Sequence, residues 1–276
     1  MRCPLCDGDG RQAFEAKGFP VLDCRSCGHR FACIDADEMH VAAHYGDAYF
    51  TGGGAGYTDY AAEGRLLRRR GLYYSAKLRS HTEPGVMLDV GAAAGFILKG
   101  FIDAGWSGIG IEPNATMAEY GRRELGLEMR TGSFEAFDAD PGSFDLVSMI
   151  QVAAHFYDPA GAFANARRLL RSGGLLLIET WDRDSLTARA FGRHWHEYSP
   201  PSVLHWFSRD SLTEYLENNG FVRIDGGRPV KKISGGHVRS LLRYRLGDNP
   251  LLRLVPERIT FPYPAEDLFW ALYRRA

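Results

Sequence analysis

Four of the five cysteines lie in two pairs near the start of the chain, at a spacing that suits a metal ion. Cys3 and Cys6 form one CxxC pair, Cys24 and Cys27 form the second, and seventeen residues separate the pairs. Two such turns can direct four thiolates at one Zn²⁺ ion with tetrahedral geometry. A closed four-sulfur site leaves no open coordination position, so this Zn²⁺ would be structural. The spacing predicts a zinc ribbon over residues 1–33, with unligated thiols or a redox pair as the alternative.

Two acidic residues accompany short apolar runs that are typical of buried strands. Asp89 lies in the run Val86–Val90, and Glu112 ends a second run 23 residues later. The turn Gly91–Gly95 leads into a helical pattern that starts at Phe96, so the order is strand, glycine turn and helix. A carboxylate at the end of the second strand can accept hydrogen bonds from the ribose hydroxyls of an adenosine cofactor. We therefore expect an adenosine-type site at this turn.

The elements that would position these residues alternate between strands and helices. Further strands are predicted at 127–130, 144–150, 175–179, 222–233 and 267–273, the last of them antiparallel. The helix before the strand at 175–179 is expected to stop at Gly173 and Gly174. Repeated alternation of this kind is typical of a parallel α/β sheet.

The composition excludes several classes of protein. The 276 residues carry 33 basic and 34 acidic side chains, so no overall field attracts nucleic acid or an anionic membrane surface. No run of roughly eighteen uncharged apolar residues occurs in the sequence, so no membrane span is expected. No apolar stretch follows the first four residues, so no signal peptide is expected either. We expect a cytoplasmic protein, in which thiols stay reduced and clustered cysteines bind metal.

Residues 86–221 resemble the class I S-adenosylmethionine (SAM) dependent methyltransferases. The resemblance rests on LDVGAAAG at the glycine turn, GIGIEP at the acidic strand end, FDLVSM in the fourth strand and LLRSGGLLLIET leading into the fifth. It implies an α/β fold with a Rossmann-like sheet of seven strands, beside the small N-terminal zinc ribbon. Ala93 stands where this family usually has a second glycine, which brings one methyl group close to the cofactor.

The resemblance also implies which residues bind SAM. The glycine turn would contact the methionine part, whose carboxylate would meet backbone amides at the helix N-terminus. Glu112 would bind the ribose, Phe134 would pack near the adenine, and Gln151 would lie at the cofactor edge. The complete predicted set is Tyr57, Asp89, Gly91, Ala93, Gly95, Phe96, Glu112, Pro113, Ser133, Phe134, Glu135 and Gln151.

The segment after the fifth strand is rich in aromatic and histidine side chains, as small-molecule sites are. Its run PSVLHWFS at 201–208 resembles a branch of bacterial methyltransferases that act on small molecules and saccharides, several of which carry an N-terminal zinc ribbon. Methyl transfer needs a base only where the acceptor must lose a proton. The candidate bases are His155, which follows the fourth strand, and His205 in the aromatic segment. A structural role is the alternative for each.

These patterns divide the chain into three parts. Residues 1–33 are predicted as the zinc ribbon, 34–84 as a lid loop with a connecting helix, and 85–276 as the methyltransferase domain, with substrate-covering insertions at 181–210 and 234–262. Glycines and aromatics over 49–57 predict a lid above bound SAM, with a passive linker as the alternative. Short helices are predicted at 238–246 and 251–255, where they could cover the site or form a homodimer contact.

Two other functions fit parts of the sequence. Some ribosomal RNA methyltransferases combine an N-terminal zinc ribbon with this domain, and the arginines within 65–70 and 239–245 could bind phosphates. The balanced charge and the aromatic segment favour a small-molecule or saccharide acceptor instead, so the arginines of 65–70 are interpreted as a solvated helix face. A non-catalytic interaction module on a decayed methyltransferase domain is the third possibility.

Overall fold

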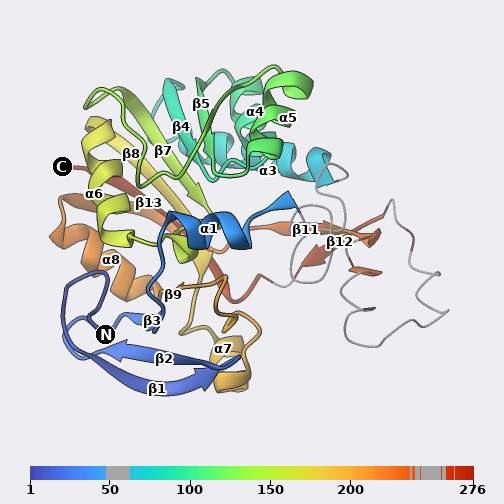
Figure 1. The fold of residues 1–276 in the computed structure, drawn as a ribbon. Coiled ribbons are helices and arrows are strands. Elements are labelled where there is room, and N and C mark those ends of the chain that lie inside the picture. The colour runs from blue at the N-terminus through green and yellow to red at the C-terminus, as the bar shows by residue number, and fades with distance from the viewer. Residues whose placement is uncertain (48–62, 237, 240–242, 244–255, 257–258, 264) are drawn as a thin grey trace.

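A sheet of seven strands forms the centre of the protein in the computed structural model (Figure 1). The structure describes residues 1–47, 63–236, 238, 239, 243, 256, 259–263 and 265–276. The strands are β4 (Val86–Val90), β5 (Ser107–Glu112), β6 (Glu128–Thr131), β7 (Phe144–Ile150), β8 (Leu170–Trp181), β10 (Phe221–Gly227) and β13 (Leu268–Arg275). Their order is β10-β13-β8-β7-β4-β5-β6, and β13 runs antiparallel to both of its neighbours. This architecture confirms the Rossmann-like methyltransferase fold.

Helices cover both faces of the sheet. They are α3 (Gly64–Leu78), α4 (Phe96–Asp103), α5 (Ala115–Leu125), α6 (Pro159–Leu169) and α8 (Arg209–Asn218). Neighbouring residues of β7 point to opposite faces, so Leu146 packs in the core with α3 and α4, and Val147 in the core with α6 and α8. Because both faces are buried, the central strands β4, β7 and β8 are mainly apolar, whereas the edge strands β6 and β10 carry more polar residues. Among the described residues, no helix has the length and apolar composition that crossing a membrane requires.

The end of α6 differs from its prediction. The sequence places the helix stop at Gly173, but α6 ends at Leu169 and β8 takes over directly. The carbonyl of Arg168, in the last helical turn, accepts a hydrogen bond from the Gly142 amide at 3.0 Å, and Leu170 is already extended and pairs with Phe144 of β7. Gly173 still adopts a positive φ of 74°, but it does so inside β8.

The predicted strand at 222–233 is divided in the structure. Its first part is β10 in the main sheet, whereas β11 (Lys231–Ser234) pairs with β12 (Thr260–Tyr263) in a separate two-stranded sheet. Apart from residues 238, 239 and 243, the helices predicted at 238–246 and 251–255 lie outside the described residues. The predicted lid at 49–57, with Tyr57, also lies outside them.

The N-terminal residues form a second sheet, and one of its strands comes from the C-terminal half of the chain. Its strands are β1 (Gly10–Ala16), β2 (Phe19–Cys24), β3 (Arg30–Ala32) and β9 (His205–Trp206), in that order. Next to β9, the Leu204 carbonyl accepts from the Ala32 amide at 2.8 Å, and the Leu204 amide donates to Ala154 at 2.9 Å. The segment predicted as an insertion at 181–210, which also contains α7 (Leu186–Phe191), thus joins the N-terminal sheet to the main domain.

Candidate active site

A cavity lies at the carboxyl ends of β4, β5 and β7, where parallel α/β sheets bind their ligands. Residues of α1 (Glu38–His44) and α3, together with Tyr45, close one side of it. The SAM-binding residues predicted from the sequence that line this cavity are Asp89, Gly91, Ala93, Glu112, Pro113, Ser133, Phe134, Glu135 and Gln151. The candidate base His155 also lines it. The fold thus brings residues from six separate segments to one site.

Gly95 and Phe96 lie behind the cavity wall rather than on it. Gly95 has a φ of 81° at the start of α4, and a Cβ atom there would lie 2.5 Å from Leu127 Cδ1. Phe96 is buried with its ring 5.9 Å from that of Tyr120. Both residues therefore shape the turn and its helix, and their positions do not indicate contact with a ligand.

Two buried carboxyl groups face the cavity. Glu112 accepts hydrogen bonds from the backbone amides of Ala93 at 2.8 Å and Asn114 at 2.9 Å, one on each oxygen. Asp89 accepts a hydrogen bond from the Ser148 hydroxyl at 2.6 Å. Burial raises the pKa of each carboxyl to about 7, although these hydrogen bonds lower it. Each Glu112 oxygen keeps a lone pair, so the site can accept hydroxyl donors or a positive charge.

Two residues with side chains adopt left-handed backbone conformations on the cavity wall. Ala93 has a φ of 48° and Gln151 a φ of 59°. This conformation costs such residues roughly 1–2 kcal/mol, and strain of this kind is concentrated at functional sites. In it, the Ala93 amide reaches Glu112, and the Gln151 amide donates to the Glu179 carbonyl at 2.7 Å. The Gln151 Nε2 is buried without a partner among the described residues, so it can donate a hydrogen bond to a ligand.

The residues after β6 form an end of the cavity that has an aromatic and an acidic side chain. Phe134 is buried, with its ring 6.0 Å from the ring of Phe156. Glu135 accepts a hydrogen bond from the Tyr157 amide at 3.0 Å, and burial raises the pKa of its carboxyl to about 7. The Ser133 hydroxyl lies 3.4 Å from the Tyr157 hydroxyl. An apolar slot with hydrogen-bond acceptors at its edge suits an aromatic ring that carries an amino group.

His155 ends the short 3-10 turn η2 (Ala153–His155). Its Nδ1 lies 2.8 Å from the Ser202 carbonyl and 2.5 Å from the Tyr45 hydroxyl. A carbonyl oxygen only accepts hydrogen bonds, so Nδ1 carries the proton of the neutral ring and Nε2 carries the lone pair. Burial lowers the pKa of His155, although the Ser202 carbonyl and the Glu197 charge raise it, so the ring is neutral at pH 7. Geometry and charge both suit a proton acceptor.

His205 does not line the cavity, and both of its ring nitrogens have partners within the protein. Its Nε2 lies 2.8 Å from the Phe156 carbonyl, and its Nδ1 lies 3.1 Å from Nε2 of His29. Nε2 therefore donates to the carbonyl and Nδ1 accepts from His29. Burial lowers the pKa of His205 to about 4. These contacts correct the interpretation of His205 as a base and support its structural alternative.

Arg70 does not lie on the solvated helix face to which the sequence interpretation assigned it. Its side chain is 12% exposed, lines the cavity and forms an ion pair with the fully buried Glu179 of β8. Tyr74 also donates a hydrogen bond to Glu179. The signal that could have identified Arg70 is its helical spacing, since Leu67, Arg70 and Tyr74 share one face of α3. Because charged residues usually face solvent, the charge of Arg70 favoured the wrong face of the helix.

The four cysteines predicted as metal ligands come together in the structure. Their Sγ atoms all lie within 4.8 Å of one another, with separations of 3.7 Å for Cys3 and Cys27, 3.5 Å for Cys6 and Cys24, and 3.3 Å for Cys6 and Cys27. A tetrahedral ion with Zn–S bonds of about 2.3 Å requires Sγ separations of about 3.8 Å. The cluster therefore fits Zn²⁺ after small shifts of the Sγ atoms.

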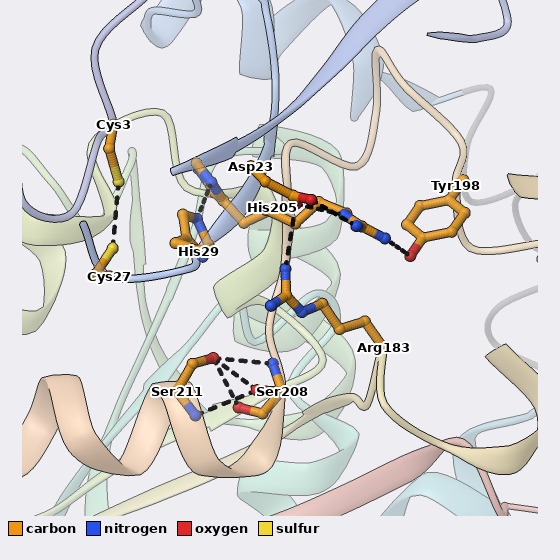
Figure 2. A network of polar contacts seen from close by, with 10 residues as sticks. Cys3, Asp23, Cys27, His29, Arg183, Tyr198, His205, Ser208 and Ser211 are labelled. Atoms are coloured by element: carbon orange, nitrogen blue, oxygen red, sulfur yellow. Dashed lines mark hydrogen bonds and ion pairs between the residues drawn. The ribbon is translucent and has the colours of Figure 1, made fainter. Parts of the chain in front are cut away.

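A polar network joins the cysteine-containing sheet to the main domain (Figure 2). Arg30 of β3 donates to both carboxylate oxygens of Asp23 at 2.7 and 2.8 Å, and to the Tyr198 hydroxyl at 2.7 Å. Arg183 approaches the same carboxylate at 3.5 Å, and Figure 2 shows His205 beside this group. The sheet is thus fixed to residues 183–205 by charge as well as by strand pairing.

The sequence of the chain is similar to that of known methyltransferases. The family model described as "Methyltransferase domain" matches residues 59–225, more than half of the chain. A ubiquinone biosynthesis O-methyltransferase of Methylococcus capsulatus is 34% identical over 162 residues, which are 50% of this chain and 68% of that enzyme. An uncharacterized transposon protein of Streptomyces fradiae is 37% identical over 98 residues, and the match spans only 28% of its length.

Solved structures share the fold. The 1,6-didemethyltoxoflavin-N1-methyltransferase of Burkholderia thailandensis, solved with 1,6-didemethyltoxoflavin and S-adenosylhomocysteine (SAH), has a TM-score of 0.55 at 16% identity. The likeness covers 96% of this chain and 99% of that one, and at this identity it is evidence of the fold alone. The family match, the sheet order and the cavity at the strand ends agree, and the chain belongs to the class I SAM-dependent methyltransferases.

Proposed function

We propose that this methyltransferase transfers a methyl group from SAM to an oxygen or nitrogen atom of a small molecule or saccharide, and that His155 accepts the proton that the acceptor loses. The observation that carries the proposal is the hydrogen bond from His155 Nδ1 to the Ser202 carbonyl, which leaves Nε2 of a neutral ring as the proton acceptor. The relative from Methylococcus capsulatus is an O-methyltransferase, which supports an oxygen acceptor.

The residues of the cavity fit SAM. Glu112 would accept the ribose hydroxyls, because each of its oxygens holds only one backbone amide. Phe134 and Glu135 would meet the face and the amino group of the adenine. The positive charge of the methionine end would lie near Asp89, and its carboxylate would meet Arg70, a cation among the cavity residues. The side-chain Nε2 of Gln151, which has no partner among the described residues, supplies a further donor at this end.

The residues around His155 would carry out the proton transfer. Bound SAM would supply an electrophilic methyl group, whose C–S bond breaks as its bond to the acceptor forms, leaving SAH. The acceptor proton would pass to Nε2 of His155 and then to solvent. Alignment of the methyl group with the acceptor atom supplies most of the rate enhancement, and a positioned base raises the rate by a further factor of roughly 10² to 10⁴.

We also propose that Cys3, Cys6, Cys24 and Cys27 hold one structural Zn²⁺, which the separations of their Sγ atoms support. Reduced thiols of this kind agree with a cytoplasmic location. With this site, we propose residues 1–33 as the ribbon, 34–84 as the connection and 85–276 as the methyltransferase domain. Elemental analysis of freshly purified protein should find about one zinc per chain. Metal-free protein isolated without chelators would contradict the proposal.

Methyl transfer from labelled SAM to a panel of phenols, amines and saccharides tests the proposed reaction. We expect His155→Gln to lower kcat for the accepted compound by roughly 10²- to 10⁴-fold, while the affinity for SAH changes less than about threefold. His194→Gln is the matched control, because His194 is exposed on η3 (Gly192–His194). An unchanged kcat in His155→Gln would exclude the base, and transfer to RNA but to no small molecule would favour the ribosomal RNA alternative.

A further inference from the structure

Tyr45 follows α1 and reaches the candidate base from across the cavity. Its hydroxyl lies 2.5 Å from Nδ1 of His155 and donates to the Ser202 carbonyl at 2.9 Å. The rings of Tyr45 and His155 pack edge to face, with centroids 5.2 Å apart and an interplanar angle of 68°. The Tyr45 hydroxyl and the Ser202 carbonyl therefore both lie within hydrogen-bond distance of the same nitrogen of His155.

The backbone of Tyr45 is fixed at the opposite end of the residue. Its amide donates to the Val41 carbonyl at 2.9 Å, and its carbonyl accepts from Nδ2 of Asn114 at 3.0 Å. Asn114 caps α5 and donates its own amide to Glu112 at 2.9 Å. A continuous series of hydrogen bonds thus runs from the proposed ribose carboxylate, through Asn114 and Tyr45, to His155.

We propose that Tyr45 is a positioning residue for methyl transfer, which holds Nδ1 of His155 through its hydroxyl and sets the distance between this base and the Glu112 strand end through its backbone. The proposal rests on the proposed role of His155 as the base. When Nε2 takes up the acceptor proton, the Nδ1–H of the charged ring has two oxygens within reach, the Tyr45 hydroxyl and the Ser202 carbonyl. Both stabilise the positive charge.

Other charged and titratable groups also act on His155. The Glu197 charge raises the pKa of His155, and His205 of β9 interacts with it as a second imidazole. Neither group is altered by the substitution Tyr45→Phe, which removes one oxygen and keeps the ring. A change in the titration of His155 in this variant therefore reports the hydroxyl itself.

NMR of protein with ¹⁵N-labelled histidine tests the inference without a methyl acceptor, and His155→Gln identifies the His155 signals. Tyr45→Phe should lower the pKa of His155 by at least half a unit, because the charged ring loses one of its two oxygen partners. Tyr273→Phe is the matched control, since its buried hydroxyl bonds Thr213 at 3.0 Å away from the cavity. It should leave the pKa of His155 unchanged.

SAH titration shows whether the Tyr45→Phe cavity is intact, and we expect an affinity within about threefold of the wild type. An unchanged pKa and unchanged ¹⁵N shifts of His155 in a variant that binds SAH normally would overturn the role of Tyr45. A variant that lost SAH binding with an unchanged His155 pKa would also overturn it. If His155→Gln instead kept full activity, the proposed base would fail, and this outcome is distinguishable from either of the others.

Discussion

We expect the substitution Glu112→Gln to weaken SAM binding by about 10- to 150-fold. In the wild type, each Glu112 oxygen accepts one backbone amide, from Ala93 or from Asn114. Glutamine has a single side-chain oxygen, so one of these amides would face an NH₂ group and one ribose hydroxyl would lose its acceptor. A hydrogen bond to a charged group contributes about 1.5–3 kcal/mol, which corresponds to the stated loss of affinity.

The affinity should also depend on pH in the wild type, with a smaller slope in Glu112→Gln, because Asp89 and Glu135 of the same cavity, whose pKa values burial also raises to about 7, still titrate in the variant. Burial raises the pKa of Glu112 to about 7, so the ionised fraction of the free protein rises about tenfold between pH 6 and pH 8. The ionised carboxylate is the form that accepts two hydroxyls, and SAM affinity should rise by up to about tenfold over this range.

Linkage predicts the opposite trend for the stability of the free protein. The pKa of Glu112 in the folded protein lies above its ordinary value of 4.5, so the folded state binds more protons between about pH 4.5 and 7. The contribution of Glu112 to the free energy of unfolding therefore falls as the pH rises through this window, by at most about 3 kcal/mol.

Calorimetric titration of SAH at pH 6, 7 and 8 measures both effects on binding. Because the same ligand is used throughout, its own titration cancels between variants. Glu119→Gln is the control, since Glu119 lies on α5 with its side chain 51% exposed. Equal affinity in wild type and Glu112→Gln, or an equal pH slope, would refute the assignment of Glu112 to the ribose.

Three other substitutions or treatments test the supporting structure. His205→Phe leaves the Phe156 carbonyl and Nε2 of His29 without a hydrogen bond, so the free energy of unfolding in urea should fall by about 2–5 kcal/mol. An unchanged urea midpoint would contradict these contacts. Arg70→Met leaves the buried Glu179 charge uncompensated and should cost about 3–5 kcal/mol, whereas the exposed Arg65→Met should cost almost nothing by the same assay. Chelation of the metal should lower the calorimetric unfolding temperature, and an identical transition in the metal-free protein would exclude a structural Zn²⁺.

The sequence predicted the parts of the protein that follow from local pattern. Apolar runs identified the central strands of the main sheet, because a strand buried on both faces is mainly apolar along its length. The distance from Asp89 to Glu112 predicted two strands that end at one edge of the sheet, and both residues line the cavity there. The two CxxC pairs predicted a four-cysteine cluster because each pair needs only a tight turn to converge.

The sequence did not indicate the contacts that orient the candidate base. Tyr45 and His155 are 110 residues apart, and His29 and His205 are 176 apart, so no local spacing relates them. His205 looked like a base because it lies in an aromatic segment, but β9 turns it toward β3 instead of the cavity. In both cases the residue that contacts the histidine ring, Tyr45 or His29, lies in the N-terminal part of the chain, which the sequence predicted to be separate from the methyltransferase domain.

The N-terminal sheet shares a hydrophobic core with the short turn that carries His155. Val21 and Ala32 of the sheet pack in one cluster with Trp206 of β9 and with Ala154, the residue before His155. A module that docks an outside partner would need no such core in common with a catalytic domain. After this sheet the chain continues into α1 and Tyr45, which line one side of the cavity. Metal bound by the four cysteines would therefore stabilise both the turn that carries His155 and the segment that contacts its ring. The architecture therefore favours a structural support of the methyl-transfer site over the non-catalytic interaction module.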